Sequence, residues 1–189
     1  MKSGQEVLDD RGYRNEIHNN AEAPAAPAVI IAYGNPLRND DGLAWSVADA
    51  LERKLGPASV EIVRLQQLTP ELAEKVSRFQ TVIFIDAEWP DRRDRQPGDV
   101  HLEEIAAQDF GFTAHTRFSH FLTPSVLVNL AAKLYGANAR AFSVTVTGQN
   151  FDHGQSISPA VQSALPRIAS RIEQLLATVK AETMTEVGA

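Results

Sequence analysis

Two short runs of uninterrupted apolar residues constrain the fold of this chain more than any other feature. Residues 28–33 read Ala-Val-Ile-Ile-Ala-Tyr, and residues 81–86 read Thr-Val-Ile-Phe-Ile-Asp. Runs of this length without polar alternation are typical of strands that are buried on both faces, as in parallel sheets covered by helices. The two runs therefore predict central strands of an α/β sheet.

The remaining chain alternates between strand-like and helix-like patterns. Leu43, Val47, Ala50 and Leu51 would share one face of a helix over residues 41–54. The other expected strands are residues 60–65, 98–105 and 141–147, and the other expected helices are residues 70–79, 123–135 and 158–176. This order predicts a single three-layer α/β domain with a mostly parallel, twisted sheet of about five strands flanked by helices.

Three of the expected helices begin with a hydroxyl residue followed by proline, which is the usual order of an N-cap and a first helical position. The pairs are Thr69-Pro70, Thr123-Pro124 and Ser158-Pro159. Gly136 is expected to end the second of these helices, because glycine readily adopts the left-handed conformation at a helix C-terminus.

The two ends of the chain differ from its centre. Residues 1–27 are charged and Asn-rich and then Ala/Pro-rich, which is typical of a flexible tail that buries too little apolar surface to become ordered. We expect the domain to span residues 28–179 and residues 180–189 to form a frayed C-terminal tail.

Composition excludes several classes of function. A net charge of −6 over 189 residues disfavours nucleic-acid binding, which needs clustered Lys and Arg. The chain has no cysteine, which excludes disulfides, a cysteine nucleophile and thiolate metal sites. No apolar run is long enough for a signal sequence or a membrane span. We therefore expect a cytoplasmic protein, and the lack of an evident exposed apolar stripe favours a monomer.

The loop after the first strand carries two adjacent carboxylates. Its sequence is Gly34-Asn-Pro-Leu-Arg-Asn-Asp-Asp-Gly42, so Asp40 and Asp41 stand at the start of a helix, where negative charge is favourable. In the simpler interpretation, one of them caps the helix and the other is solvated. The loop matches neither glycine-rich phosphate motif, and two carboxylates would repel a phosphate.

Two more polar groups are expected at the same edge of the sheet, because sites in such sheets form at the carboxyl ends of strands. Asp86 directly follows an apolar strand, and Ser119-His120 precedes a helix. Each also has a simpler interpretation, as a turn cap for Asp86 and as a surface or packing residue for His120. Together, Asp41, Asp86 and His120 would form a mixed oxygen and nitrogen site for nickel, zinc, iron or manganese, as in a metal-dependent hydrolase.

Five sequence blocks resemble, in order and spacing, those of the [NiFe]-hydrogenase maturation proteases. The resemblance extends over residues 28–178. The blocks are Gly34 to Gly42, Val82-Ile-Phe-Ile-Asp-Ala87, Pro97-Gly-Asp-Val100, Ser119-His120, and Thr147-Gly148 with Ile157-Ser158-Pro159. The resemblance implies a phosphorylase/hydrolase-like arrangement of the sheet and its helices.

The resemblance also implies a function. Such proteases remove a C-terminal extension from the large-subunit precursor of a hydrogenase after nickel has been inserted into it. By motif, Asp41, Asp86 and His120 would be the three metal ligands, with nickel delivered by the substrate, although zinc or cadmium would also fit. Either Asp41 or Asp86 would act as general base, or the metal would activate the water. Asn35, Asp40 and Ser119, which flank these positions, are expected to contact the substrate.

The chain departs from the family pattern at two places. Ala32 stands where many members have glycine, and residues 65–69 lack the carboxylate of the usual acidic segment. These departures argue against a fourth acidic residue near the metal and are consistent with a different partner hydrogenase. Two other functions also stay open. One is a nickel-sensing chaperone that binds the precursor without cutting it, and the other is a small-molecule hydrolase, which would need a deep apolar pocket at the strand ends.

Overall fold

The computed structural model describes residues 26–90, 95–105 and 122–187 of the chain. Five strands form one sheet in the order β2-β1-β3-β5-β4. Their bounds are β1 (Ala28–Tyr33), β2 (Glu61–Leu65), β3 (Thr81–Glu88), β4 (Val100–Ile105) and β5 (Arg140–Thr147). β1, β2, β3 and β5 run parallel, and β4 pairs antiparallel with β5 at the edge.

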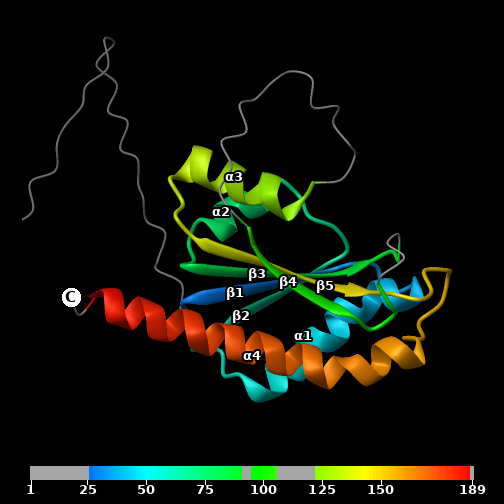
Figure 1. Cartoon of the computed structure of the whole chain (residues 1–189). Helices are drawn as coiled ribbons and strands as arrows, with labels where there is room; N and C mark the ends of the chain where they lie inside the picture. The colour runs from blue at the N-terminus through cyan, green and yellow to red at the C-terminus, as the bar shows by residue number, and fades with distance from the viewer. Residues whose placement is uncertain (1–25, 91–94, 106–121, 188–189) are drawn as a thin grey trace, which may run out of the picture.

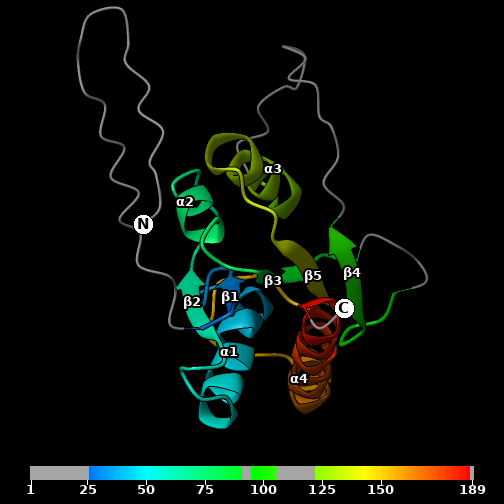
Figure 2. The same cartoon turned by 90° about the vertical axis from the view of Figure 1, so that its left-hand side faces the viewer.

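Helices cover both faces of this sheet (Figure 1). The short 3-10 helix η1 (Asn39–Gly42) connects β1 to α1. The α-helices are α1 (Leu43–Lys54), α2 (Leu72–Val76), α3 (Pro124–Tyr135) and α4 (Pro159–Val187). Figure 2 shows α1 and α4 on one face and α2 and α3 on the other. The expected three-layer α/β domain with a mostly parallel sheet of five strands is therefore confirmed.

Alternation along each strand divides the core into two clusters. Ile30 and Ala32 of β1 pack on the side of α1 and α4. Val29 and Ile31 pack on the side of α2 and α3, and Tyr33 borders the same cluster. Because neighbouring strands share this alternation, side chains paired in register at the strand ends lie on the same face.

The sequence prediction was correct for the start of α3 and wrong for the start of α2. Thr123 caps α3 as expected, since its hydroxyl accepts a hydrogen bond from the amide of Val126 at 3.4 Å, and Gly136 ends that helix with a φ of 66°. The prediction for α2 was wrong at its start. Residues 69–73 form a turn in which the amide of Leu72 donates to the carbonyl of Thr69 at 3.1 Å, so α2 begins only at Leu72.

The last helix is longer than expected. We expected it to end at residue 176 and the chain to fray from residue 180, but α4 continues to Val187. Val179 is buried against the core, and Arg140 at the start of β5 forms an ion pair with Glu182. These contacts come from distant parts of the chain, so the helical periodicity did not reveal them. No helix in the described part of the chain has both the length and the apolar character of a membrane span.

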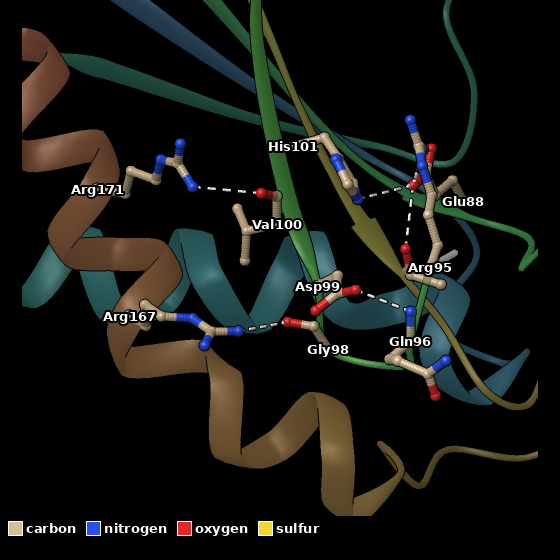
Figure 3. Close-up of polar contacts among 10 residues, drawn as sticks. Glu88, Arg95, Gln96, Gly98, Asp99, Val100, His101, Arg167 and Arg171 are labelled. Atoms are coloured by element: carbon tan, nitrogen blue, oxygen red, sulfur yellow. Dashed lines mark hydrogen bonds and ion pairs between the residues drawn. The ribbon is translucent and has the colours of Figure 1, made fainter. Parts of the chain in front are cut away.

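The edge strand β4 is attached to α4 by two arginines (Figure 3). Arg167 donates to the carbonyl of Gly98 at 2.7 Å, and Arg171 donates to the carbonyl of Val100 at 3.2 Å. These contacts fix the start of β4 next to the carboxyl ends of β3 and β5. The candidate site lies at the same end of the parallel strands.

Candidate functional site

A pocket of about 580 Å³ opens at the carboxyl ends of β1 and β3. Its lining is mainly polar, with a smaller apolar part from the segments that lead into α2 and α3. The lining residues are Tyr33, Gly34, Asn35, Arg38, Asp41, Gln66, Gln67, Leu68, Asp86, Leu122, Thr123 and Pro124. The structure therefore brings Asp41 and Asp86 together, as the sequence predicted.

Asp41 is held by the tight turn after β1. The amide of Asn35 donates to Oδ2 of Asp41 at 2.9 Å, and Oδ1 of Asn35 accepts from the amide of Leu37 at 2.9 Å. Gly34 has a φ of 137°, and a Cβ at this position would lie 2.1 Å from the carbonyl oxygen of Asp41. Glycine is therefore required for the close approach that places the Asp41 carboxylate at the pocket.

Asp86 is partly buried and stands two residues before the end of β3, which continues to Glu88 beyond the expected strand end at residue 86. Its Oδ1 accepts from the amide of Ala87 at 2.8 Å. Burial raises the pKa of Asp86 to about 7, with smaller contributions from the negative charges of Asp41 and Glu88, while hydrogen bonds from Tyr33 and Ala87 oppose the rise. A carboxyl group with a pKa near neutrality is suited to accept a proton during hydrolysis.

Tyr33, the last residue of β1, adjoins Asp86. Burial, followed by the charge of Asp86 and a hydrogen bond to it, raises the pKa of Tyr33 far above its usual range, so the hydroxyl keeps its proton. In the sequence, Tyr33 is only the last residue of an apolar run, so its proximity to Asp86 was not predicted. A tyrosine as the last residue of a central strand was the available signal.

Asp40 has a different environment from its neighbour. It is fully buried. Its Oδ2 accepts from the amides of Gln149 and Asn150 at 2.8 and 3.0 Å, and its Oδ1 accepts from the amide of Ser158 at 2.6 Å. The carboxylate thus binds the 148–158 loop, which does not suit the substrate contact that we expected for Asp40.

Asn39 makes similar contacts with the same loop. It is nearly buried and has a φ of 48°. Its Nδ2 donates to the carbonyl of Asp152 at 3.1 Å, and its Oδ1 accepts from the amide of Ser156 at 3.1 Å. A parallel bridge joins Arg38 to Gly154. The first and last of the five sequence blocks are therefore direct neighbours, joined by side chains of the first block and backbone groups of the 148–158 loop.

Replacing Asp40 with Asn is expected to lower the free energy of unfolding by about 2 kcal/mol. Whichever carboxylate oxygen becomes an amide nitrogen will face a backbone N–H donor, which then has no acceptor. Urea unfolding measures the change. Asp49→Asn is the matched control, because the Asp49 side chain is 57% exposed in its ion pair with Arg64 and should change stability by less than about 1 kcal/mol. Equal effects of the two substitutions would contradict this role of Asp40.

The histidine expected to complete the site, His120, and the neighbouring Ser119 lie outside the described residues. Within the described part of the chain, no group of three or more His, Cys, Asp or Glu side chains could hold a metal ion. The described ligand candidates at the pocket are therefore the two carboxylates, whose oxygen atoms suit a divalent cation.

A second polar cluster lies on the same face of the sheet as Asp86. Figure 3 shows its residues Glu88, Arg95 and His101. Glu88 accepts hydrogen bonds from Arg95 and, at 3.1 Å, from the hydroxyl of Thr147. Nε2 of His101 is 3.6 Å from Oε1 of Glu88. In register, Asp86 pairs with Thr145 and Thr145 pairs with His101, so His101 is two strands away from Asp86. This cluster positions Glu88 and adds its charge to the surroundings of Asp86.

Comparison with known proteins yields matches among solved structures only. No protein-family model matches the chain, and no curated protein matches it. The [NiFe] hydrogenase maturation protease HybD from Thermococcus kodakarensis is 18% identical with a TM-score of 0.58, and the match covers 79% of this chain and 98% of that one. The hydrogenase maturating endopeptidase HybD from E. coli is 20% identical with a TM-score of 0.59, and the match covers 82% of this chain and 93% of that one.

A further match is the [NiFe] hydrogenase maturation protease HycI from Thermococcus kodakarensis KOD1. It is 17% identical with a TM-score of 0.62, and the match covers 80% of this chain and 93% of that one. The chain therefore has the fold of these maturation proteases. At such identities the likeness establishes the fold, and the activity rests on the residues of the pocket.

Proposed function

We propose that this protein is an endopeptidase that removes the C-terminal extension from the nickel-loaded large-subunit precursor of a [NiFe] hydrogenase. The observation that carries the proposal is the meeting of Asp41 and Asp86, from two separate sequence blocks, in one pocket of a fold shared with maturation proteases. Most of the residues that line the pocket carry polar side chains, whereas small-molecule sites are lined predominantly by apolar ones, which favours a peptide as substrate.

The proposed chemistry assigns different tasks to the two carboxylates. Asp86, with a pKa near 7, takes a proton from water as the water oxygen bonds to the scissile carbonyl carbon. The carbon–nitrogen bond then breaks, and the proton passes to the leaving amine. Asp41, held by the amide of Asn35, provides a fixed negative charge on the same side of the pocket.

Nickel enters this scheme as part of the substrate. Oxygen atoms of Asp41 and Asp86 would contact the ion carried by the precursor, and we propose His120 as the third ligand. A bound divalent ion also polarises a carbonyl group. The requirement for nickel would then act as a check that the precursor is already loaded, and zinc or cadmium would serve as substitutes in vitro.

The test is the intact mass of the precursor. The purified protein is mixed with nickel-loaded precursor, and we expect the loss of a short C-terminal peptide. The loss should be absent with nickel-free precursor and with Asp41→Asn. It should be present with the control Asp49→Asn, because the carboxylate of Asp49 on α1 pairs with Arg64 of β2, away from the pocket. A stable complex with unchanged mass would support the chaperone instead. If the protein neither bound nor cleaved the precursor, this class of substrate would be rejected.

The remaining expectations belong to the same proposal. We propose that the protein acts as a monomer in the cytoplasm, where the precursor would be loaded with nickel. Size-exclusion chromatography with light scattering on the full chain measures the first point, and a dimer would contradict it.

A further inference from the structure

Arg38 is the only described residue with a positive charge that lines the candidate pocket. The carboxylates of Asp41 and Asp86 line the same pocket. Among the described residues, no Asp or Glu forms an ion pair with Arg38, although Asp41 is only three positions away in the chain. The charge of Arg38 is therefore available to a ligand of opposite charge.

Contacts with two separate parts of the chain hold Arg38 in place. Its amide donates to the carbonyl of Asn35 at 3.0 Å, and its carbonyl accepts from the amide of Asp41 at 3.1 Å. A parallel bridge joins it to Gly154, and its Nε donates to the carbonyl of Phe151 at 3.1 Å. A side chain that is held before binding loses less conformational freedom when a ligand arrives.

The contact with Phe151 determines which edge of the guanidinium group is available. Nε lies on the side edge of the planar group and is used in that contact, whereas Nη1 and Nη2 at its end bind no described residue. The N–H groups at this end match the two oxygens of a carboxylate, which arginine binds in a bidentate manner. A peptide carbonyl offers only one oxygen, so a carboxylate is the better match.

Two exposed apolar side chains lie near Arg38. Leu37 is its neighbour in the chain and is 52% exposed. Trp89 is 60% exposed, and its ring contacts the ring of Phe151 with centroids 4.5 Å apart. Exposed apolar side chains that gather beside a polar group are typical of interaction sites. These surroundings suit a peptide whose apolar side chains cover Leu37 and Trp89 while its carboxylate binds Arg38.

We propose that Arg38 is a specificity-determining residue of the site, and that Nη1 and Nη2 of its guanidinium bind a carboxylate of the precursor's C-terminal extension. This inference rests on the proposed function. Every C-terminal extension ends in a carboxylate, and Asp or Glu side chains can supply others. Asp41 and Asp86 repel such a group, so the charges of the pocket direct it towards Arg38.

A purely structural role for Arg38 would require only its contact with the 148–158 loop. Arg38→Lys and Arg38→Gln both lose the Nε contact with Phe151, but lysine keeps the charge. Urea unfolding of the two variants measures the structural part. Arg53→Gln is the matched control, because Arg53 is exposed in the last turn of α1 and does not line the pocket. Figure 2 shows α1 on the face of the sheet opposite α2 and α3.

The experiment presents three forms of the nickel-loaded precursor to the full-length protein. The first has the natural extension. In the second, every Asp and Glu of the extension is replaced with Asn or Gln. The third ends in a carboxamide, introduced by ligation of a synthetic extension. Intact mass gives kcat and KM for each form, and fluorescence anisotropy of the labelled precursor gives a dissociation constant if no cleavage occurs.

We expect Arg38→Gln to raise KM for the natural precursor about 10-fold, with little change in kcat, because the bond forms equally in the ground state and the transition state. Arg38→Lys should have an intermediate KM, and Arg53→Gln should behave like the wild type.

The precursor form that lacks the bound carboxylate should raise the wild-type KM by a similar factor, and Arg38→Gln should then raise it no further. An effect of the Asn/Gln form would assign the contact to an acidic side chain, and an effect of the carboxamide form would assign it to the chain end. The wild-type comparison stays informative even if the Arg38 variants are less stable.

Two results would overturn the role of Arg38 and leave the endopeptidase intact. One is an Arg38→Gln variant with a wild-type KM for the natural precursor. The other is a KM that this variant raises by the same factor for all three precursor forms, because Arg38 would then not bind a carboxylate of the extension.

Failure of the proposed function would look different. A wild type that binds the precursor but never shortens it would reject the endopeptidase, and the dissociation constants of the same three forms would then decide the role of Arg38. A wild type that did not bind the precursor at all would overturn both.

Discussion

Replacing Asp86 with Asn is expected to lower kcat/KM for precursor processing by about 10²- to 10⁴-fold, the usual contribution of a general base. Asn has nearly the same shape as Asp and still accepts from the amide of Ala87, but it cannot take a proton from water. The rise of the Asp86 pKa to about 7 in the free protein also predicts that the wild-type kcat/KM falls as the pH drops below 7. Initial rates from intact mass, measured across pH, test both statements.

Asp41 and Asp49 provide the comparison for this prediction. Asp41→Asn should cause a loss of similar size, because Asp41 lines the same pocket, whereas Asp49→Asn on α1 should process the precursor like the wild type. If Asp86→Asn kept full activity, Asp86 would be neither the base nor an essential ligand, and the assignment of the site would be wrong.

Asp86→Asn is also expected to stabilise the fold at high pH. Burial raises the pKa of Asp86 from 3.8 to about 7, so the folded protein binds this proton more tightly than the unfolded chain does. Its contribution to stability is complete below pH about 4 and is lost as the pH rises to about 7. The difference of about 3 between the folded and unfolded pKa values corresponds to about 4 kcal/mol, which is the upper limit of the gain for Asp86→Asn at pH about 8.

Urea unfolding of the wild type and of Asp86→Asn near pH 4 and pH 8 measures this effect. The variant should exceed the wild type at the higher pH, and the difference should shrink towards zero at the lower pH. A difference of the same size at both pH values would mean that the ionisation of Asp86 is not its cause. A variant that is more stable but inactive would show that the site is maintained at a cost in stability.

Local patterns along the chain predicted most of the fold because its central strands are buried on both faces. The runs at residues 28–33 and 81–86 became β1 and β3, and the Thr123-Pro124 start and Gly136 end of α3 were confirmed. The error at the end of α4 arose because distant contacts decide the outcome there. The last turns of α4 depend on burial of Val179 and on the pairing of Glu182 with Arg140, which no periodicity encodes.

The sequence by itself determined the α/β class, the order of the strands along the chain and the placement of Asp41 and Asp86 at strand ends, because apolar runs and turn residues act locally. Only the tertiary structure separated Asp40 from Asp41. The two are chemically identical neighbours, yet the carboxylate of Asp40 accepts from three backbone amides of the 148–158 loop, whereas that of Asp41 lines the pocket. Only the parallel pairing of β1 with β3 placed Tyr33 beside Asp86, because register depends on strands that are 48 residues or more apart in the chain.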